Sequence, residues 1–294
     1  MNLSEQIKSM ILSGIVEEQH RKIGVEIESF YYEKGDLRRL ALDNKNKYSA
    51  IDLLSDINKI AQANQDTHSY SLEPGGQLEW ASSPTISLWD ILNEYSKNVL
   101  AQKELCVNNA IDIGYFSVEP ISNPLDIVLI NSNKYQLMHN LFKNTGKLGP
   151  WMMRNTASIQ VNIDYTSEED ANEMAYVADA IQPLVSILFS NAPFIQGETV
   201  GTENLRWKIW NDTDSSRCGT LFEHNIRNPK NIINDYVKWL QSRECIFIEN
   251  LDGKFNSFDG DLGSMIATEK NPDLIYSAFR QIFTHVRFKT VLEV

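Results

Sequence analysis

Several segments of this 294-residue chain alternate apolar residues with residues that carry a side-chain oxygen, which is the pattern of a strand with one polar face. In IGVEIESF, residues 23–30, Glu26 and Glu28 share one face while Val25 and Ile27 share the other. Neighbouring carboxylates repel each other, and their burial is costly unless a cation or hydrogen-bond donors compensate. Taken alone, this segment is equally consistent with a solvated strand face.

Three further predicted strands repeat the pattern. Their polar residues are Gln77 and Glu79, which follow Glu73 and a Pro-Gly-Gly turn; Gln160 and Asn162; and Arg287, Lys289 and Glu293 on a strand over 287–294. If these strands share a sheet, one face becomes a basin of carboxylate and amide oxygens. Such hard ligands favour Mg²⁺ or Mn²⁺ over zinc, and these ions commonly connect carboxylates to nucleotide phosphates.

The charge of the chain limits its partners. Lys and Arg number 27 against 39 Asp and Glu, for a net charge of −12, which disfavours nucleic acid. An acidic protein can still hold ATP through metal ions. The three cysteines have no metal-site or disulfide spacing. No secretory signal and no apolar run of about 18 residues is found, so we expect a soluble, cytoplasmic protein without a membrane partner.

The remaining periodicity predicts long helices among isolated strands. Helices are expected over 3–19, 49–63, 85–110, 167–188 and 273–284. The lack of regular strand–helix alternation, repeats and linkers predicts one α+β domain over residues 1–294 with a mainly antiparallel sheet.

A polar segment, residues 191–219, is expected to be a long connection. It contains Arg206, Trp207 and Trp210. An arginine beside aromatic residues is either a packed surface arginine or a carboxylate clamp, and the sequence alone leaves both open.

Six segments together resemble glutamate–cysteine ligase of the plant and proteobacterial type. They are RKIGVEIESF, YSLEPGGQLEW, WMMRNTASIQVNIDY, FSNAPFIQG, RWKIWNDTDSSRCG and FTHVRFKTVLEV, in the family's order and across nearly the whole chain. The combination of SLEPGGQ, QVN and NDTDSSR is specific, whereas each piece alone is weak.

The resemblance implies a glutamine-synthetase-like catalytic domain, in which a curved antiparallel sheet with flanking helices forms an active-site funnel. It also implies that the γ-carboxylate of L-glutamate is joined to the amine of L-cysteine through a γ-glutamyl phosphate, which is the first step of glutathione biosynthesis. The implied cofactors are ATP and two or three Mg²⁺ ions, with Mn²⁺ as an alternative.

The resemblance further implies roles for individual residues. The expected metal ligands are Glu26, Glu28, Glu73, Glu79, Gln160 and Glu293. Glu73, Gln160 and Asn162 are expected at the ATP phosphates. Arg206, Trp210 and Thr156 are expected to bind glutamate, with Thr156 on a strand that lines the pocket. Glu26, Glu28 and Arg206 are expected to be catalytic.

The chain ends at Val294, where the family's matching strand continues, so we expect it to lack the C-terminal part of the family domain. Two other functions therefore stay open at this point. One is a related carboxylate–amine ligase with another acceptor amine. The other is a truncated, non-catalytic Mg-ATP-binding protein. The sequence does not determine the oligomeric state.

Overall fold

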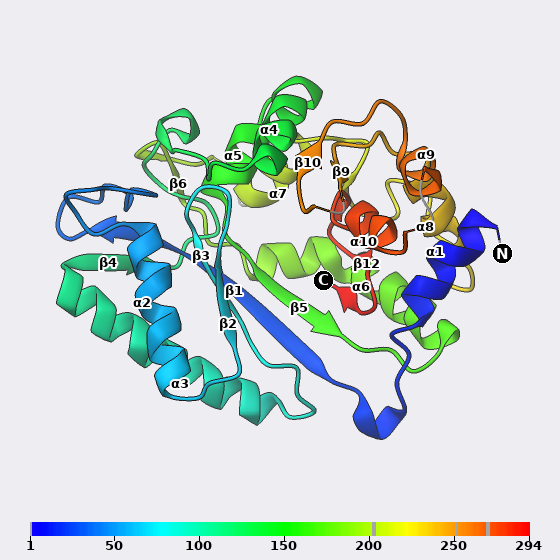
Figure 1. The fold of residues 1–294 in the computed structure, drawn as a ribbon, viewed down its shortest axis with the longest axis horizontal. Coiled ribbons are helices and arrows are strands. Elements are labelled where there is room, and N and C mark those ends of the chain that lie inside the picture. Colours follow the sequence, from blue (N-terminus) through cyan, green and yellow to red (C-terminus); the bar gives the residue numbers. More distant parts are fainter. Residues whose placement is uncertain (1, 202–203, 251, 269–270) are drawn as a thin grey trace.

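The computed structural model describes residues 2–201, 204–250, 252–268 and 271–294 (Figure 1). It shows a seven-stranded sheet with helices packed around it, and every strand pairing within this sheet is antiparallel. The predicted α+β class with a mainly antiparallel sheet is therefore confirmed.

The sheet is built around β1 (Ile23–Glu33), its longest strand. The strand order is β12-β13-β5-β1-β3-β2, and β4 pairs with the second half of β1. The other strands are β2 (Ser69–Leu72), β3 (Leu78–Ala81), β4 (Ile111–Gly114), β5 (Ile159–Ile163), β12 (Arg287–Phe288) and β13 (Leu292–Glu293).

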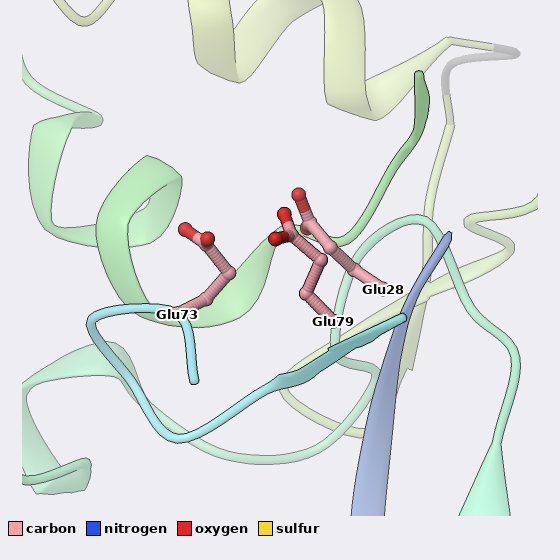
Figure 2. Close-up of side chains that lie close together, drawn as sticks. All are labelled: Glu28, Glu73 and Glu79. Carbon is pink, nitrogen blue, oxygen red and sulfur yellow. The ribbon is translucent and has the colours of Figure 1, made fainter. Parts of the chain in front are cut away.

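The register of these strands gathers the polar residues on one face. Directly opposed pairs are Glu28 with Glu79, Glu26 with Gln160, Asn162 with Glu293, and Glu293 with Arg287. Opposed residues in an antiparallel pair project to the same side of the sheet. Figure 2 shows Glu28 on β1 and Glu79 on β3 pointing the same way. Strands distant in the chain thus form one continuous polar surface.

The opposite face of β1–β3 is apolar. It packs against α2 (Ala50–Ala63) and α3 (Leu88–Asn109), with fully buried Trp80 in the cluster and Val25 and Ile27 against it. Ser49 and Asp52 form a capping box at the start of α2, in which the side chain of each residue accepts a hydrogen bond from the backbone amide of the other. Apolar burial on one face leaves the other face free to carry charge.

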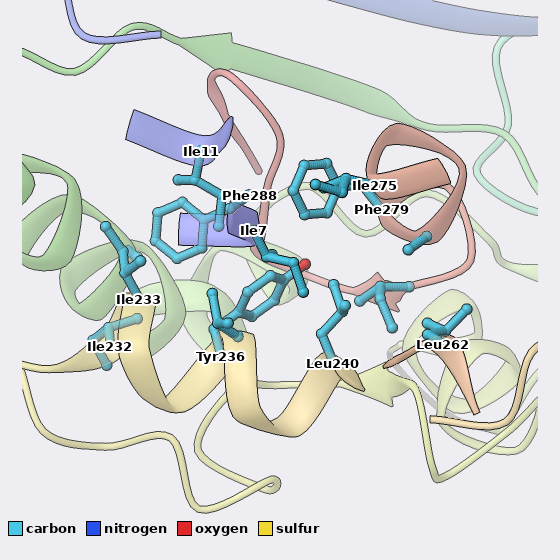
Figure 3. Packing of buried hydrophobic residues seen from close by; sticks show 14 of the residues in the cluster. Ile7, Ile11, Ile232, Ile233, Tyr236, Leu240, Leu262, Ile275, Phe279 and Phe288 are labelled. Carbon is cyan, nitrogen blue, oxygen red and sulfur yellow. The ribbon is translucent and has the colours of Figure 1, made fainter. Parts of the chain in front are cut away.

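A second core lies beyond the β12–β13 end of the sheet. It joins α1 (Leu3–Leu12), α6 (Glu168–Leu188), α8 (Ile232–Gln241), α9 (Leu262–Ala267) and α10 (Asp273–Phe279). Figure 3 shows Ile7 and Ile11 of α1 beside Ile233, Tyr236 and Leu240 of α8, with Phe288 of β12 among them. This core anchors the hairpin that carries Arg287 and Glu293.

A third core closes the remaining side of the polar face. It contains α4 (Asn133–Thr145), α5 (Gly149–Asn155) and α7 (Leu205–Asn211), with Phe142, Met153 and Ile209 buried between them.

The short elements are η1 (Glu18–His20), η2 (Pro124–Asp126), β6 (Phe194–Ile195), β7 (Glu198–Thr199), β8 (Cys218–Gly219), β9 (Ile248–Glu249), β10 (Phe255–Asn256) and β11 (Phe283–Thr284). No helix in the described ranges is both long enough and apolar enough to cross a membrane.

Two helix predictions were too long. The first helix ends at Leu12 instead of residue 19, because the chain turns at Ser13 and Gly14 packs directly on the backbone of Thr290. The last helix ends at Phe279 instead of residue 284, and residues 283–284 pair with β8 as β11. In both cases the helix ends before its apolar periodicity does, because the following residues make a tertiary contact instead.

Two further predictions assigned the wrong type of secondary structure. Residues 287–294 form a tight hairpin, not one strand, with a turn closed by Lys289 N–H donating to Val291 O at 2.9 Å. Within 191–219, Arg206 lies on helix α7, not in a connection, and Asn204 caps this helix by accepting from the Trp207 amide at 3.2 Å. Residues 202–203 of that segment lie outside the described ranges.

We predict that Gly75→Ala destabilises the fold. A Cβ at this turn would lie 2.7 Å from both Cα and O of Arg154, which is backbone and cannot move aside cheaply. Overpacking of this kind costs about 1–3 kcal/mol, and urea unfolding measures it. Gly24→Ala in β1 is the control, because its nearest contacts would be at 3.9 Å. Equal unfolding free energies for the two variants would contradict the prediction.

Candidate active site

The polar face of the sheet forms the floor of a pocket of about 460 Å³, a volume suited to small-molecule ligands. Helices α4, α5 and α7 and the segment from Phe283 to Lys289 contribute its walls. Its charged lining residues are Glu26, Glu28, Glu73, Glu79, Lys134, Arg206, Arg280, Arg287, Lys289 and Glu293. Acidic and basic side chains therefore face the same cavity.

Three of the acidic residues, Glu28, Glu73 and Glu79, form what we call the carboxylate trio. One oxygen from each lies within 4.8 Å of the others, and the trio is the one group of this kind found among the described residues. Figure 2 shows the three carboxylates converging from β1, β3 and the turn before β3. Hard oxygen ligands at this spacing suit a Mg²⁺ or Mn²⁺ ion.

The surroundings of Glu28 and Glu73 oppose the ionisation of these two carboxyl groups. Burial raises the pKa of Glu28 to about 7, against hydrogen bonds from the Ser158 hydroxyl (2.8 Å) and amide (3.0 Å). Burial, followed by the charges of Glu28 and Glu79, raises the pKa of Glu73 well above its usual range. A divalent cation between the carboxylates would remove this penalty, so the trio fits the metal that the sequence predicts.

The turn that carries Glu73 is held from three sides. Within the turn, Gly76 N–H donates to Glu73 O at 2.8 Å. The side-chain amide of Gln77 donates to Thr156 O at 2.8 Å, and the buried guanidinium of Arg39 donates to Gly75 O at 3.0 Å. These bonds fix the Glu73 carboxylate near the two strand carboxylates despite their repulsion.

The other expected metal ligands belong to a separate network. Glu26 accepts hydrogen bonds from the amides of Gln160 and Asn162, both at 2.8 Å. Arg287 donates to Gln160 Oε1 at 3.0 Å and pairs with Glu293. The oxygens of Glu26 and Gln160 are thus engaged by protein groups in this structure.

Glu293 is nearly fully buried and is paired with both Arg287 and Lys289. Burial alone would raise its pKa, but the two cations outweigh burial and lower it. The structure therefore divides the six expected metal residues into the trio and a network of Glu26, Gln160 and Glu293. Asn162 joins the network but does not line the pocket.

The expected glutamate-binding residues lie at the Glu28 side of the pocket. Arg206 uses Nε to donate to Ala157 O at 3.1 Å, while its terminal nitrogens have no hydrogen-bond partner among the described residues. Its guanidinium lies 5.4 Å from the centre of the Trp210 ring. Burial lowers the pKa of Arg206, and the charge of Glu28 opposes this shift. A charged fork with free donors suits a carboxylate.

Thr156 lies in the same pocket, but not on a strand. It caps the end of α5, and β5 begins only at Ile159. Its hydroxyl donates to Met152 O at 2.7 Å, so towards a ligand it can act only as an acceptor.

Comparison of the sequence with known proteins identifies the family of the chain. The model of the family described as glutamate-cysteine ligase family 2 (GCS2) matches residues 22–294. The chain belongs to this family. The resemblance read from the sequence is therefore confirmed.

Curated relatives carry the same family name. Glutamate–cysteine ligase A, chloroplastic, of Oryza sativa subsp. japonica is 29% identical over 311 residues, covering 98% of this chain and 61% of the relative. Glutamate–cysteine ligase, chloroplastic, of Arabidopsis thaliana is 29% identical over 98% of this chain and 58% of the relative. The Brassica juncea protein of that name is 31% identical over 98% and 59%. The chain thus spans about three fifths of the length of these family members.

The sequence did not single out several residues of this family member's pocket. They are Lys134, Tyr135, Ser158, Arg280 and His285. His285 stacks on Trp207 with ring centres 4.2 Å apart, and its buried Nε2 has no partner in the described part of the chain. Burial, then the charge of Arg206, lowers the His285 pKa to about 3, so the ring is neutral. No motif or residue spacing in the sequence indicates that these residues line a pocket.

We predict that, without divalent ions, the melting temperature falls as pH rises from about 5 to about 8. A folded-state pKa of about 7 for Glu28, against the ordinary 4.5, means that the folded state holds the proton more tightly. That stability is complete below about pH 4.5 and is lost as pH passes through 7. Glu28→Gln should flatten this dependence in thermal melts.

Added Mg²⁺ should raise the wild-type melting temperature at pH 8 more than that of Glu28→Gln, because the ion binds the folded state. Glu104→Gln is the matched control, since Glu104 lies exposed on α3, away from the polar face. The same Mg²⁺ response in all three proteins would show that the trio does not bind the ion.

Proposed function

We propose that this chain is an ATP-dependent ligase that joins the γ-carboxylate of L-glutamate to the amine of L-cysteine and so produces γ-glutamylcysteine for glutathione biosynthesis. The observation that carries the proposal is a carboxylate trio and an arginine with free donors in one pocket of a chain from this family. Residues from Glu26 to Glu293 line that pocket, which supports a single catalytic domain. The sheet floor and helical walls are consistent with a glutamine-synthetase-like funnel.

The trio would hold the divalent ion, Mg²⁺ or Mn²⁺. When bound, this ion supplies positive charge that offsets the phosphates of ATP and polarises the group being transferred. Additional ions, up to the two or three expected, would have to use Glu26, Gln160 or Glu293. Each of these already accepts a hydrogen bond or an ion pair from a protein group and keeps a further lone pair that an ion could use.

Arg206 would bind the α-carboxylate of glutamate through its two terminal nitrogens, with Trp210 beside it and Thr156 as an acceptor for the α-ammonium group. This places the γ-carboxylate towards the trio. Glu26 and Glu28 would act by charge and position, and Glu73 and Gln160 would lie near the phosphates. Asn162, which does not line the pocket, would act only through its hydrogen bond to Glu26.

The reaction must activate a carboxylate, because amide formation from a carboxylate is uphill in water. A γ-carboxylate oxygen attacks the γ-phosphorus of ATP, the bond from that phosphorus to the β–γ bridging oxygen breaks, and ADP leaves. The cysteine nitrogen then attacks the acyl carbon, the carbon–oxygen bond to phosphate breaks, and the ammonium formed loses a proton. The protein contributes orientation and charge stabilisation.

Release of ADP by the purified chain should depend on both glutamate and cysteine. A coupled ADP assay with glutamate and a panel of acceptor amines measures this dependence. If another amine is used and cysteine is not, the chain is a related ligase with a different acceptor. Binding of Mg-ATP without ADP release under any combination would favour the non-catalytic alternative.

We also propose the expected cytoplasmic location, although the relatives named above are chloroplastic.

Glu26→Gln should lower kcat by about 10²-fold or more, since it removes one charge at the reacting groups. The neutral amide keeps the size of the side chain, but its NH2 group replaces one of the two oxygens that accept from Gln160 and Asn162, so one of these hydrogen bonds is lost. Steady-state ADP release measures the effect, and circular dichroism checks the fold. Wild-type kcat in this variant would remove Glu26 from the catalytic machinery.

Arg206→Lys should raise KM for glutamate by about 10- to 100-fold with a smaller change in kcat, because a point charge replaces a two-pronged donor. Arg38→Lys is the matched control, since Arg38 is an exposed arginine outside the pocket. A change confined to KM for ATP would place Arg206 at the nucleotide instead.

A further inference from the structure

Arg39 is a buried arginine that lies outside the pocket lining and carries no ion pair. Its side chain is 7% exposed, and no carboxylate lies within 4.0 Å of it in the described part of the chain. Its guanidinium lies 4.6 Å from the centre of the Phe30 ring and donates to two backbone carbonyls. Burial of an unpaired charge is costly, so these contacts are what keep the side chain in place.

The two carbonyls belong to the segments that bring Glu73 and Thr156 to the pocket. Arg39 Nη2 donates to Gly75 O at 3.0 Å, in the turn that carries Glu73. Its Nη1 donates to Arg154 O at 3.4 Å, in the last turn of α5, where carbonyls have no partner within the helix. One planar guanidinium therefore spans the turn and the end of the helix.

The turn and the helix end are in direct backbone contact. A Cβ on Gly75 would lie 2.7 Å from both Cα and O of Arg154, and both residues are buried. No donor other than Arg39 reaches either carbonyl oxygen among the described residues. Without this guanidinium, two buried acceptors would be left without a hydrogen bond where the segments meet, which favours their separation.

Arg39 is itself fixed to the strand that carries Glu28. After β1 the chain returns along this strand, and Arg39 forms an antiparallel bridge with Tyr32. The next amide, Leu40 N–H, donates to Tyr31 O at 2.8 Å. Because β1 is the central strand of the sheet, Arg39 connects the position of the turn before β3 directly to that of the strand.

We propose that Arg39 is a positioning residue for the carboxylate trio: it holds the Glu73 carboxylate beside those of Glu28 and Glu79 and so sets the affinity of the trio for a divalent ion. The inference rests on the proposed function, because it requires that the trio binds metal. Arg39 acts through the turn and touches no substrate. The sequence gave no indication of this role.

The test is the binding of Mn²⁺ alone, measured from the electron paramagnetic resonance signal of the free ion. Arg39→Lys should raise the Kd about 10- to 100-fold, the usual effect of losing a group that orients a metal ligand. A lysine ammonium is a point charge and does not reproduce the fork that spans two carbonyls. The titration is run at a temperature at which circular dichroism shows the variant to be folded.

Arg217→Lys is the matched control. Arg217 is also fully buried, but it is paired with Asp214 and lies outside the pocket lining. This variant should lose stability and keep the wild-type affinity for Mn²⁺. The comparison separates the position of Glu73 from the general effect of changing a buried arginine.

Two further measurements test whether Arg39 acts through the turn. Glu73→Gln removes the carboxylate that is positioned, so adding Arg39→Lys to it should cause no further loss of Mn²⁺ affinity. In the metal-free protein, hydrogen exchange of the Gly76 amide, which donates to Glu73 O, should be faster in Arg39→Lys. Unchanged exchange would contradict the inference.

The outcomes distinguish this inference from the proposed function. Wild-type Mn²⁺ affinity in Arg39→Lys would overturn the inference and leave the proposed function intact. Equal losses in Arg39→Lys and Arg217→Lys, or a further loss in the double variant, would also overturn it. A wild-type chain that binds no Mn²⁺ would overturn the proposed metal site and this inference together.

Discussion

Mutual repulsion among Glu28, Glu79 and Glu73 is the constraint around which the rest of the structure is arranged. Two of these carboxylates are directly opposed on adjacent strands, where like charges destabilise a sheet. The third is brought in by a turn that is bonded to Thr156 and Arg39. The fold must hold them together by contacts made elsewhere, which is common at sites that bind charged ligands.

The stabilising contacts lie on the far side and at the ends of the sheet. Trp80 and the apolar residues of β1 pack against α2 and α3, directly behind the carboxylates. The core around Phe288 anchors the C-terminal hairpin, and the core around Phe142 anchors the α4 and α7 walls. Each element that contributes a charge to the pocket is thus fixed by apolar burial outside it.

Pairing decides which charges in the pocket remain available. Glu26 accepts from two amides and Glu293 is paired with two cations, whereas no carboxylate of the trio has a cation within 4.0 Å in the described part of the chain. Ion pairing also separates the cations of the pocket: Arg280, Arg287 and Lys289 are paired with carboxylates, whereas Lys134 and Arg206 have no carboxylate within 4.0 Å in the described part of the chain.

The sequence by itself determined which residues share a face. Side chains alternate along a strand, so Glu26 with Glu28, and Gln160 with Asn162, had to point the same way in any sheet. The combination of segments also determined the family. The tertiary structure alone decided that 287–294 folds back as a hairpin, because Lys289–Val291 carries no glycine, proline or asparagine to indicate a turn. It alone placed Lys134 and Arg280 at the pocket, since helical periodicity gives the face of a helix but not the neighbour that it meets. Ion pairing depends on distances between segments far apart in the chain, and only packing sets those distances.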